Sequence, residues 1–198
     1  MDQRGFGFSQ GTRGFIPEPQ LARDDLLAFT QKVSEQFSGD DVPLFTMGHS
    51  LGGALQLLMA AEAPQLIKGM TLITPFIGLA PKQQEEFDKL KTMMRIVNYV
   101  APHYQFNMKK EEPTWLHHWR ADPNDLGHKV NPNNVLRAEE ASQMLMNEIV
   151  HKVKTPYQII TAGQDDVCST PRSQEFFDLS PAEDKEIIDF QDANHMII

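Results

Sequence analysis

A serine flanked by glycines stands directly between two apolar segments of this chain. The motif is Gly48-His-Ser-Leu-Gly-Gly53. Residues 42–47 before it are short and apolar, as in a buried strand, and residues 51–63 are apolar almost all round, as in a helix buried against a sheet. A strand, a tight turn and a helix in this order lift a serine hydroxyl above the edge of a sheet. The motif therefore predicts that Ser50 is a nucleophile.

The neighbours of this serine support the prediction. We expect glycine at positions 48 and 52 because a side chain at either would collide with the adjoining strand or helix. The helix that begins at Leu51 directs free N–H groups toward Ser50, where they can stabilise a developing negative charge. The backbone N–H of Leu51 is the oxyanion donor that this turn predicts.

A serine hydroxyl needs a general base, and the base needs a carboxylate that orients it. With this type of turn the chain order is serine, acid, histidine. His195 is the only histidine after the last predicted strand, at residues 186–190, and a short loop separates the two. Asp165 and Asp166 both follow an apolar strand at residues 157–162. We predict His195 as the base, while the residues alone leave both aspartates open as the acid.

Strand-like and helix-like segments alternate along the chain, which predicts a mostly parallel α/β sheet with flanking helices. A polar, largely helical stretch interrupts the alternation. We expect three parts: core at 1–77, a helical insertion at 78–153, and core again at 154–198. Within these parts, Asn131-Pro-Asn-Asn is predicted to be loop, and Thr170 is predicted to cap a helix over 171–179.

Composition excludes several classes of protein. The formal net charge of −9 argues against a nucleic-acid binder, because no basic cluster is available to neutralise phosphates. The single cysteine excludes an intramolecular disulfide framework and a cysteine-rich zinc site. Apart from one adjacent pair, the histidines lack the spacing of metal ligands. No apolar run reaches the length of about 20 residues that spans a bilayer. We expect no metal and no cofactor.

Four blocks of sequence resemble, in order, the α/β-hydrolases of the monoacylglycerol lipase and lysophospholipase group, also called the serine aminopeptidase (S33-type) family. They are Asp2-x-Arg-Gly-x-Gly-x-Ser-x-Gly11, Gly48-His-Ser-Leu-Gly-Gly53, Gly163-Gln-Asp-Asp166 and Ala193-Asn-His195. In the family's acid loop the catalytic aspartate is the third residue after glycine. The resemblance therefore selects Asp166 over Asp165 as the acid.

The resemblance implies a serine hydrolase that cleaves lipid esters, most simply a monoacylglycerol or lysophospholipid, through an acyl-enzyme. It also implies that residues 78–153 form a cap whose apolar side chains line an acyl-chain tunnel. We expect the substrate contacts to come from Met93, Met94, Val97 and Trp115. Such a cap can also contact a membrane peripherally, and the expected location is cytoplasmic or membrane-associated.

The resemblance leaves two alternatives open. An amide or peptide hydrolase of the aminopeptidase kind would use the same three residues. The family also places strands and a His-Gly loop, the source of a second oxyanion donor, before the Asp-x-Arg-Gly block, and here only Met1 precedes that block. We therefore expect an N-terminally truncated member that lacks the second donor. Its extreme form would be a non-catalytic fragment that binds a lipid or a partner.

Overall fold

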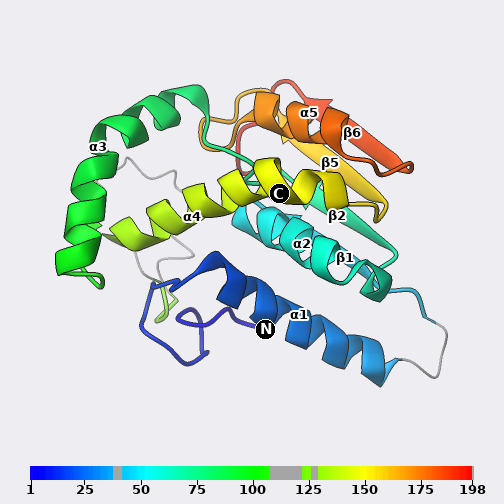
Figure 1. Cartoon of the computed structure of the whole chain (residues 1–198), viewed down its shortest axis with the longest axis horizontal. Coiled ribbons are helices and arrows are strands. Elements are labelled where there is room, and N and C mark those ends of the chain that lie inside the picture. Colours follow the sequence, from blue (N-terminus) through cyan, green and yellow to red (C-terminus); the bar gives the residue numbers. More distant parts are fainter. Residues whose placement is uncertain (38–41, 108–121, 126–128, 198) are drawn as a thin grey trace.

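The computed structural model describes residues 1–37, 42–107, 122–125 and 129–197. Its centre is a four-stranded sheet in the order β1-β2-β5-β6, seen in Figure 1. All three strand pairs are parallel. The strands are β1 (Phe45–His49), β2 (Gly69–Ile73), β5 (Tyr157–Ala162) and β6 (Lys185–Phe190). The predicted α/β class is confirmed, and the carboxyl ends of these strands meet at one edge, where ligands of such sheets usually bind.

Strand β1 begins and ends later than predicted. The expected strand was 42–47, whereas the pairing with β2 runs from Phe45 opposite Gly69 to His49 opposite Ile73. Pro43 has no N–H to donate to a ladder, which favours a start after it. Because the pairing continues to His49, this residue is the last of the strand and immediately precedes Ser50.

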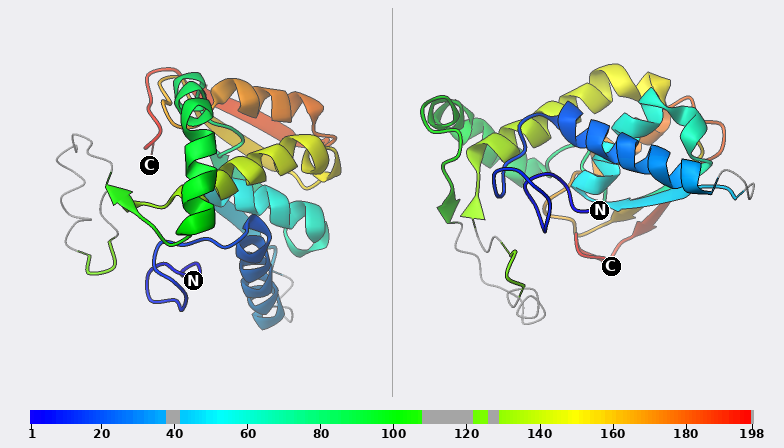
Figure 2. Two further views of the ribbon diagram at one scale, coloured as in Figure 1. Left: turned by 60° about the vertical axis from the view of Figure 1, so that its left-hand side comes forward. Right: turned by 90° about the horizontal axis from the view of Figure 1, so that it is seen from below.

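The helices that cover the sheet lie on one of its faces, in front of it in Figure 1 and above it in the right-hand view of Figure 2. They are α1 (Pro19–Gln36), α2 (Leu51–Glu62), α4 (Pro132–Met144) and α5 (Thr170–Leu179). A short 3₁₀ turn, η1 (Pro64–Leu66), follows α2. None of the helices in the described part of the chain has the length and apolar character needed to cross a bilayer.

The cap of α5 differs from the prediction. Ser169, rather than Thr170, is the N-cap residue, and its hydroxyl accepts a hydrogen bond from the N–H of Arg172 at 3.3 Å. Thr170 is the first helical residue, and its hydroxyl donates to the carbonyl of Ala162 at the end of β5. The N-terminus of α5 is thereby attached to the edge of the sheet that carries the strand ends.

The stretch 78–153 contains a long helix, a small ribbon and a second helix. These are α3 (Pro81–Val100), the antiparallel pair β3 (Phe106–Asn107) and β4 (Lys129–Val130), and α4, which continues into a π-helical turn, η3 (Leu145–Ile149), and a 3₁₀ turn, η4 (Val150–Lys152). Asn131-Pro-Asn-Asn was predicted to be loop, and this is wrong. Asn131 caps α4 by accepting from the N–H of Asn133, and Pro132 is the first residue of the helix, a position that tolerates proline.

The core fills the space between the sheet and its helices. Leu57 of α2, Leu72 of β2, Ile159 of β5 and Phe176 of α5 are fully buried in it. The same cluster includes the end of the stretch 78–153, with its members Ala141, Leu145, Met146, Ile149, Val150 and Val153. The final turns of that stretch thus pack with the sheet and not apart from it. The three-part division of the chain stays a prediction.

The glycine-rich N-terminal loop is compact. The amide of Gly5 donates to the carbonyl of Gln10, and its carbonyl accepts from Gly14. Gly5 has a φ of +80°, and a Cβ there would lie 2.6 Å from the carbonyl oxygen of Thr12, so only glycine fits. Arg4 forms a two-pronged ion pair with Asp25, which attaches the loop to α1.

Two asparagines at the start of α4 hold the other end of this loop. The side chain of Asn134 accepts from the N–H of Ile16 and donates to the carbonyl of Gly14. The side-chain amide of Asn133, which is 2 % exposed, donates to the carbonyl of Ile16. Hydrogen bonds from both asparagine side chains therefore join the first turn of α4 to residues 14–16. These two segments are far apart in the sequence.

Candidate active site

Ser50 occupies the turn between β1 and α2 in a conformation that is uncommon for a residue with a side chain, with φ 53° and ψ −121°. Backbone hydrogen bonds fix this turn to the end of β2. The N–H of Ser50 donates to the carbonyl of Ile73 at 2.9 Å, and its carbonyl accepts from Phe76 at 2.9 Å. The predicted strand–turn–helix context of Ser50 is present, and the strained turn projects its hydroxyl from the sheet edge.

The glycines around Ser50 have unequal roles. A Cβ on Gly48 would lie 2.7 Å from the backbone carbon of Gly52, and one on Gly53 would lie 2.9 Å from Cβ of Pro75. A Cβ on Gly52 would meet nothing within 4 Å among the described residues. The expectation that Gly52 is needed to avoid a collision is therefore wrong. The close approach that excludes a side chain involves Gly48 and Gly53.

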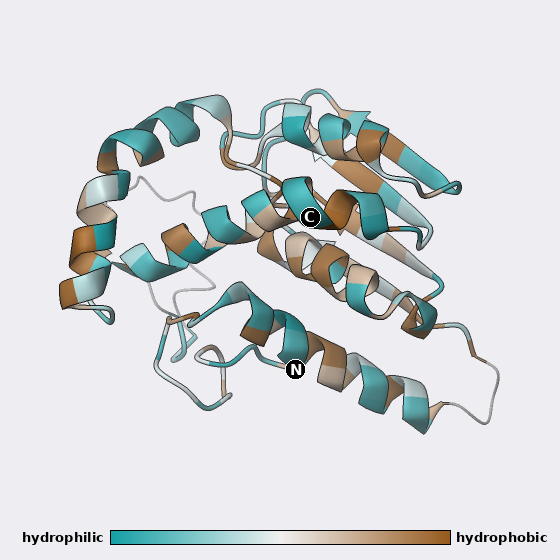
Figure 3. Ribbon diagram, in the orientation of Figure 1, coloured by the Kyte–Doolittle hydropathy of each residue, from teal (hydrophilic) through white to brown (hydrophobic). Residues whose placement is uncertain are grey.

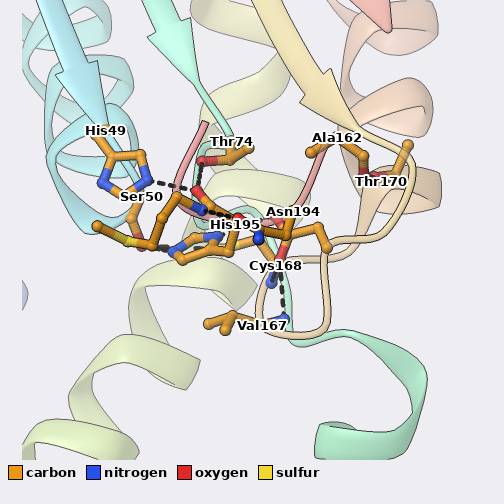
Figure 4. Close-up of polar contacts among 11 residues, drawn as sticks. His49, Ser50, Thr74, Ala162, Val167, Cys168, Thr170, Asn194 and His195 are labelled. Atoms are coloured by element: carbon orange, nitrogen blue, oxygen red, sulfur yellow. Dashed lines mark hydrogen bonds and ion pairs between the residues drawn. The ribbon is translucent and has the colours of Figure 1, made fainter. Parts of the chain in front are cut away.

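His195 reaches Ser50 from the loop that follows β6. Its Nε2 lies 3.1 Å from Oγ of Ser50. Figure 4 shows the two side chains next to each other. Nδ1 of His195 lies 2.9 Å from Oδ2 of Asp165, and a carboxylate can only accept. Nδ1 therefore carries the proton of the neutral imidazole, and Nε2 is free to accept from the serine hydroxyl. Ser50 and His195, both predicted from sequence, are in contact.

The carboxylate on His195 belongs to Asp165 and not to Asp166. After β5 the chain turns at once, with the N–H of Asp165 donating to the carbonyl of Ala162. Oδ1 of Asp165 accepts from the N–H groups of Val167 and Cys168, both at 2.8 Å, which leaves Oδ2 for the histidine. Asp166, the next residue in the turn, is exposed. The structure thus contradicts the placement of Asp166 beside His195.

The environment of Asp165 keeps its carboxylate charged. The side chain is 2 % exposed and that of His195 is 12 % exposed. Burial disfavours the charged form. The hydrogen bonds from His195 and from the N–H groups of Cys168 and Val167 outweigh burial, so the pKa of Asp165 lies below its usual value. A charged carboxylate in this place both orients the imidazole and stabilises its protonated form.

Two residues with no role predicted from the sequence hold the backbone of His195. Nε2 of His49 lies 2.9 Å from the carbonyl oxygen of His195, and Oγ1 of Thr74 donates to the same oxygen at 3.2 Å (Figure 4). Their only sequence signal was position, since His49 immediately precedes Ser50 and Thr74 immediately follows β2. The contacts are to a backbone atom, which no motif encodes.

Cys168 is buried beside the serine, with its Sγ 3.9 Å from Oγ of Ser50. Burial and the nearby charge of Asp165 raise the pKa of this thiol to about 12. Its sulfur and donor atoms of Asp165 and His195 lie within 4.8 Å of one another. The thiol is protonated at neutral pH, and the carboxylate of Asp165 and the imidazole of His195 are hydrogen-bonded to each other. This arrangement suits a histidine that is held by hydrogen bonds better than it suits a bound metal ion.

The predicted substrate contacts are spread over different environments. Met94 is buried on the inner face of α3, Val97 is partly buried, and Met93 is 55 % exposed. Trp115 lies outside the described residues.

Leu51 is the first residue of α2, so its N–H has no acceptor within the helix. Leu51 directly follows Ser50, and its role as an oxyanion donor stays a prediction.

Gly163 allows the turn after β5, which carries Asp165, to approach the loop after β6, which carries His195 and is called the histidine loop below. Its N–H donates to the carbonyl of Phe190, the last residue of β6, and the N–H of Gln164 donates to the carbonyl of Ala193. A Cβ on Gly163 would lie 2.5 Å from the carbonyl oxygen of Gln191. A side chain at this position would therefore push the two loops apart.

Gly163→Ala is expected to lower the rate at which Ser50 reacts with a fluorophosphonate by about 10²-fold, because His195 and Asp165 lie on the two loops that would separate, and a displacement of about 1 Å typically costs this much. The time course of labelling measures the effect. Gln164→Ala, which changes an exposed side chain in the same turn, is the matched control. Wild-type activity in Gly163→Ala would contradict the prediction.

Known proteins resemble this chain in sequence. The family model described as serine aminopeptidase, S33, matches residues 1–198. The monoglyceride lipases of rat and human are each 26 % identical over 208 residues, and the alignments include 99 % of this chain. The chain spans 65 % of the length of each of these relatives.

Solved structures share the fold. A soluble variant of the monoglyceride lipase of Saccharomyces cerevisiae, in complex with a substrate analog, superposes with a TM-score of 0.82 at 20 % identity, covering 98 % of this chain and 68 % of that one. The monoacylglycerol lipase of Paleococcus ferrophilus gives 0.76 at 20 % identity, covering 99 % and 74 %. With the family model matched from end to end, the chain belongs to the serine aminopeptidase S33 family and has the α/β-hydrolase fold.

Proposed function

We propose that this protein is a serine hydrolase that cleaves carboxylic esters of lipids, with monoacylglycerol as the favoured substrate, through an acyl-enzyme. The observation that carries the proposal is the unbroken series of contacts from Ser50 through His195 to Asp165. It lies at the carboxyl edge of a parallel sheet, and a strained turn presents the serine. Because relatives of this chain are monoglyceride lipases, we propose a glyceride rather than another ester as the substrate.

In the proposed reaction, Nε2 of His195 takes the proton of the Ser50 hydroxyl as Oγ attacks the ester carbonyl. The N–H of Leu51 donates to the oxyanion of the tetrahedral intermediate. The intermediate collapses to the acyl-serine, and the leaving alcohol receives the proton from His195. Water then attacks the acyl-serine by the same steps, which releases the fatty acid and restores the serine. Asp165 stabilises the imidazolium throughout and remains charged.

A membrane-facing role for α3 belongs to this proposal. Leu90, Met93, Ile96 and Val100 recur at three- to four-residue spacing on α3 and are 42 %, 55 %, 60 % and 75 % exposed. Figure 3 shows apolar residues gathered in the second half of this helix. An exposed apolar stripe of this kind suits peripheral contact with the surface that holds a lipid substrate. Within the proposal, residues 78–153 act as the cap over the acyl chain.

The deciding experiment compares two substrates and one covalent probe. The purified protein is expected to be labelled by a fluorophosphonate and to hydrolyse a monoacylglycerol faster than an aminoacyl-naphthylamide, and Ser50→Ala serves as the unreactive control. Faster turnover of the amide would replace the lipase assignment by an aminopeptidase. Absence of both labelling and turnover would overturn the proposal in favour of a non-catalytic binding protein.

A further inference from the structure

We propose that Thr74 and His49 are positioning residues that hold the backbone carbonyl of His195 and thereby fix its imidazole against Ser50. The proposal rests on the proposed function, because it assigns a role within that reaction. Both side chains act on the backbone of His195 and leave its two ring nitrogens to Ser50 and Asp165. We call the pair His49 and Thr74 the carbonyl clamp.

The carbonyl clamp joins the histidine loop to β1 and β2. His49 is the last residue of β1 and Thr74 directly follows β2, so each donor is anchored at the end of a paired strand. A carbonyl can only accept, so Nε2 of His49 carries a proton toward it. The rings of His49 and His195 also lie close together, tilted at an interplanar angle of 41° with centroids 4.8 Å apart.

The backbone of Thr74 supports a dedicated role. Its φ is +39°, and a β-branched residue rarely adopts a positive φ. Glycine would adopt this conformation without strain, so a threonine here points to a use of its side chain. The residue is 2 % exposed, its N–H donates to the carbonyl of Ile160 on β5 at 2.7 Å, and its hydroxyl reaches the carbonyl of His195. Strain at this position thus coincides with a hydrogen bond to the histidine.

Without the clamp, the ring of His195 would still be held by Asp165. The loop before it would be held at Ala193, whose N–H donates to Phe190 and whose carbonyl accepts from the N–H of Gln164. Ala193 lies two residues before His195, so the His195 peptide could rotate and move Nε2 relative to Oγ of Ser50. Because displacements of about 1 Å cost about 10²-fold in rate, this placement matters to the reaction.

The test compares isosteric and conservative variants of each clamp residue. Thr74→Val removes the hydroxyl and keeps the shape, so kcat for ester hydrolysis and the rate of fluorophosphonate labelling are expected to fall about tenfold with KM unchanged. Thr74→Ser, which keeps the donor, is expected to restore most of the loss. Thr155→Val is the matched control, because the Thr155 hydroxyl is buried with no hydrogen-bond partner among the described residues.

His49 supplies the second arm. His49→Ala is expected to lower kcat in the same way, and His49→Gln, whose amide can donate to the same oxygen, to recover part of it. Since both donors share one acceptor, the losses in the His49→Ala/Thr74→Val double variant should not multiply. The low-field proton NMR signal of the His195 Nδ1–H is expected to broaden in the Ala and Val variants.

The outcomes separate this proposal from the proposed function. A wild-type protein that neither labels nor hydrolyses overturns the proposed function itself. A wild-type protein that is active, with Thr74→Val and His49→Ala equally active and their NMR signals unchanged, overturns the clamp alone. Loss of activity in Thr74→Ser equal to that in Thr74→Val would also overturn it, because the hydroxyl would then not be the group that matters. If Thr74→Val fails to fold, the His49 arm decides.

Discussion

Asp165→Asn is expected to lower kcat for ester hydrolysis by about 10⁴-fold, and Asp166→Asn to leave it within about twofold of wild type. The amide would present either a donor to the Nδ1–H of His195 or an oxygen without charge. In the first case the imidazole must change its tautomer, and Nε2 can no longer accept the serine proton. In the second, the imidazolium loses its stabilising charge. Steady-state kinetics on both variants measures the contrast.

The two aspartates form their own matched pair, because they are adjacent and differ in their surroundings. Asp165 is buried and bonded to His195, while Asp166 is exposed. A large loss in Asp166→Asn together with an active Asp165→Asn would reverse the assignment made from the structure. It would restore the one that the family's spacing predicts.

Gly48→Ala is expected to destabilise the fold by about 3 kcal/mol and to abolish labelling of Ser50. The new Cβ would lie 2.7 Å from the carbon and 2.8 Å from the oxygen of the Gly52 backbone. Backbone atoms cannot move aside as a flexible side chain can, so the strand and the helix on either side of Ser50 must separate. Urea unfolding, followed by circular dichroism, measures the change in the free energy of unfolding.

Gly52→Ala is the control for this prediction, since a Cβ at that position meets nothing within 4 Å among the described residues. In the first turn of α2, alanine is expected to leave stability unchanged or raise it by up to about 1 kcal/mol, because glycine is the poorer helix former. Equal destabilisation by both substitutions would show that the motif needs its two glycines for a reason other than this contact.

The contact between Ser50 and His195 could be predicted from the sequence because the place of each residue follows from local pattern and chain order. Ser50 stands between an apolar strand and an apolar helix, and His195 is the only histidine after the last strand. The choice between Asp165 and Asp166 depends on how tightly the chain turns after β5. That turn is fixed by hydrogen bonds to Val167 and Cys168, which composition does not reveal.

Other differences between the sequence-based predictions and the structure also come from hydrogen bonds that composition does not reveal. Asn131-Pro-Asn-Asn has the composition of a loop, but asparagine is also a good N-cap and proline a good first helical residue. The structure uses them in that way at the start of α4. The contacts of His49 and Thr74 could not be predicted, because both side chains reach a backbone carbonyl and no motif encodes such a contact. The strands and helices were easier to predict, since buried apolar runs and helical periodicity repeat over many residues.

The attachment of the N-terminal loop to α4 has a mechanical consequence. Asn133 and Asn134 join the first turn of α4 to residues 14–16. The far end of the same helix runs into turns that pack in the core, where Leu145 and Val150 are fully buried. Helix α4 is thus held at its first turn by hydrogen bonds and at its far end by packing in the core. A displacement within residues 78–153 therefore costs less in α3, whose apolar stripe is exposed, than in α4.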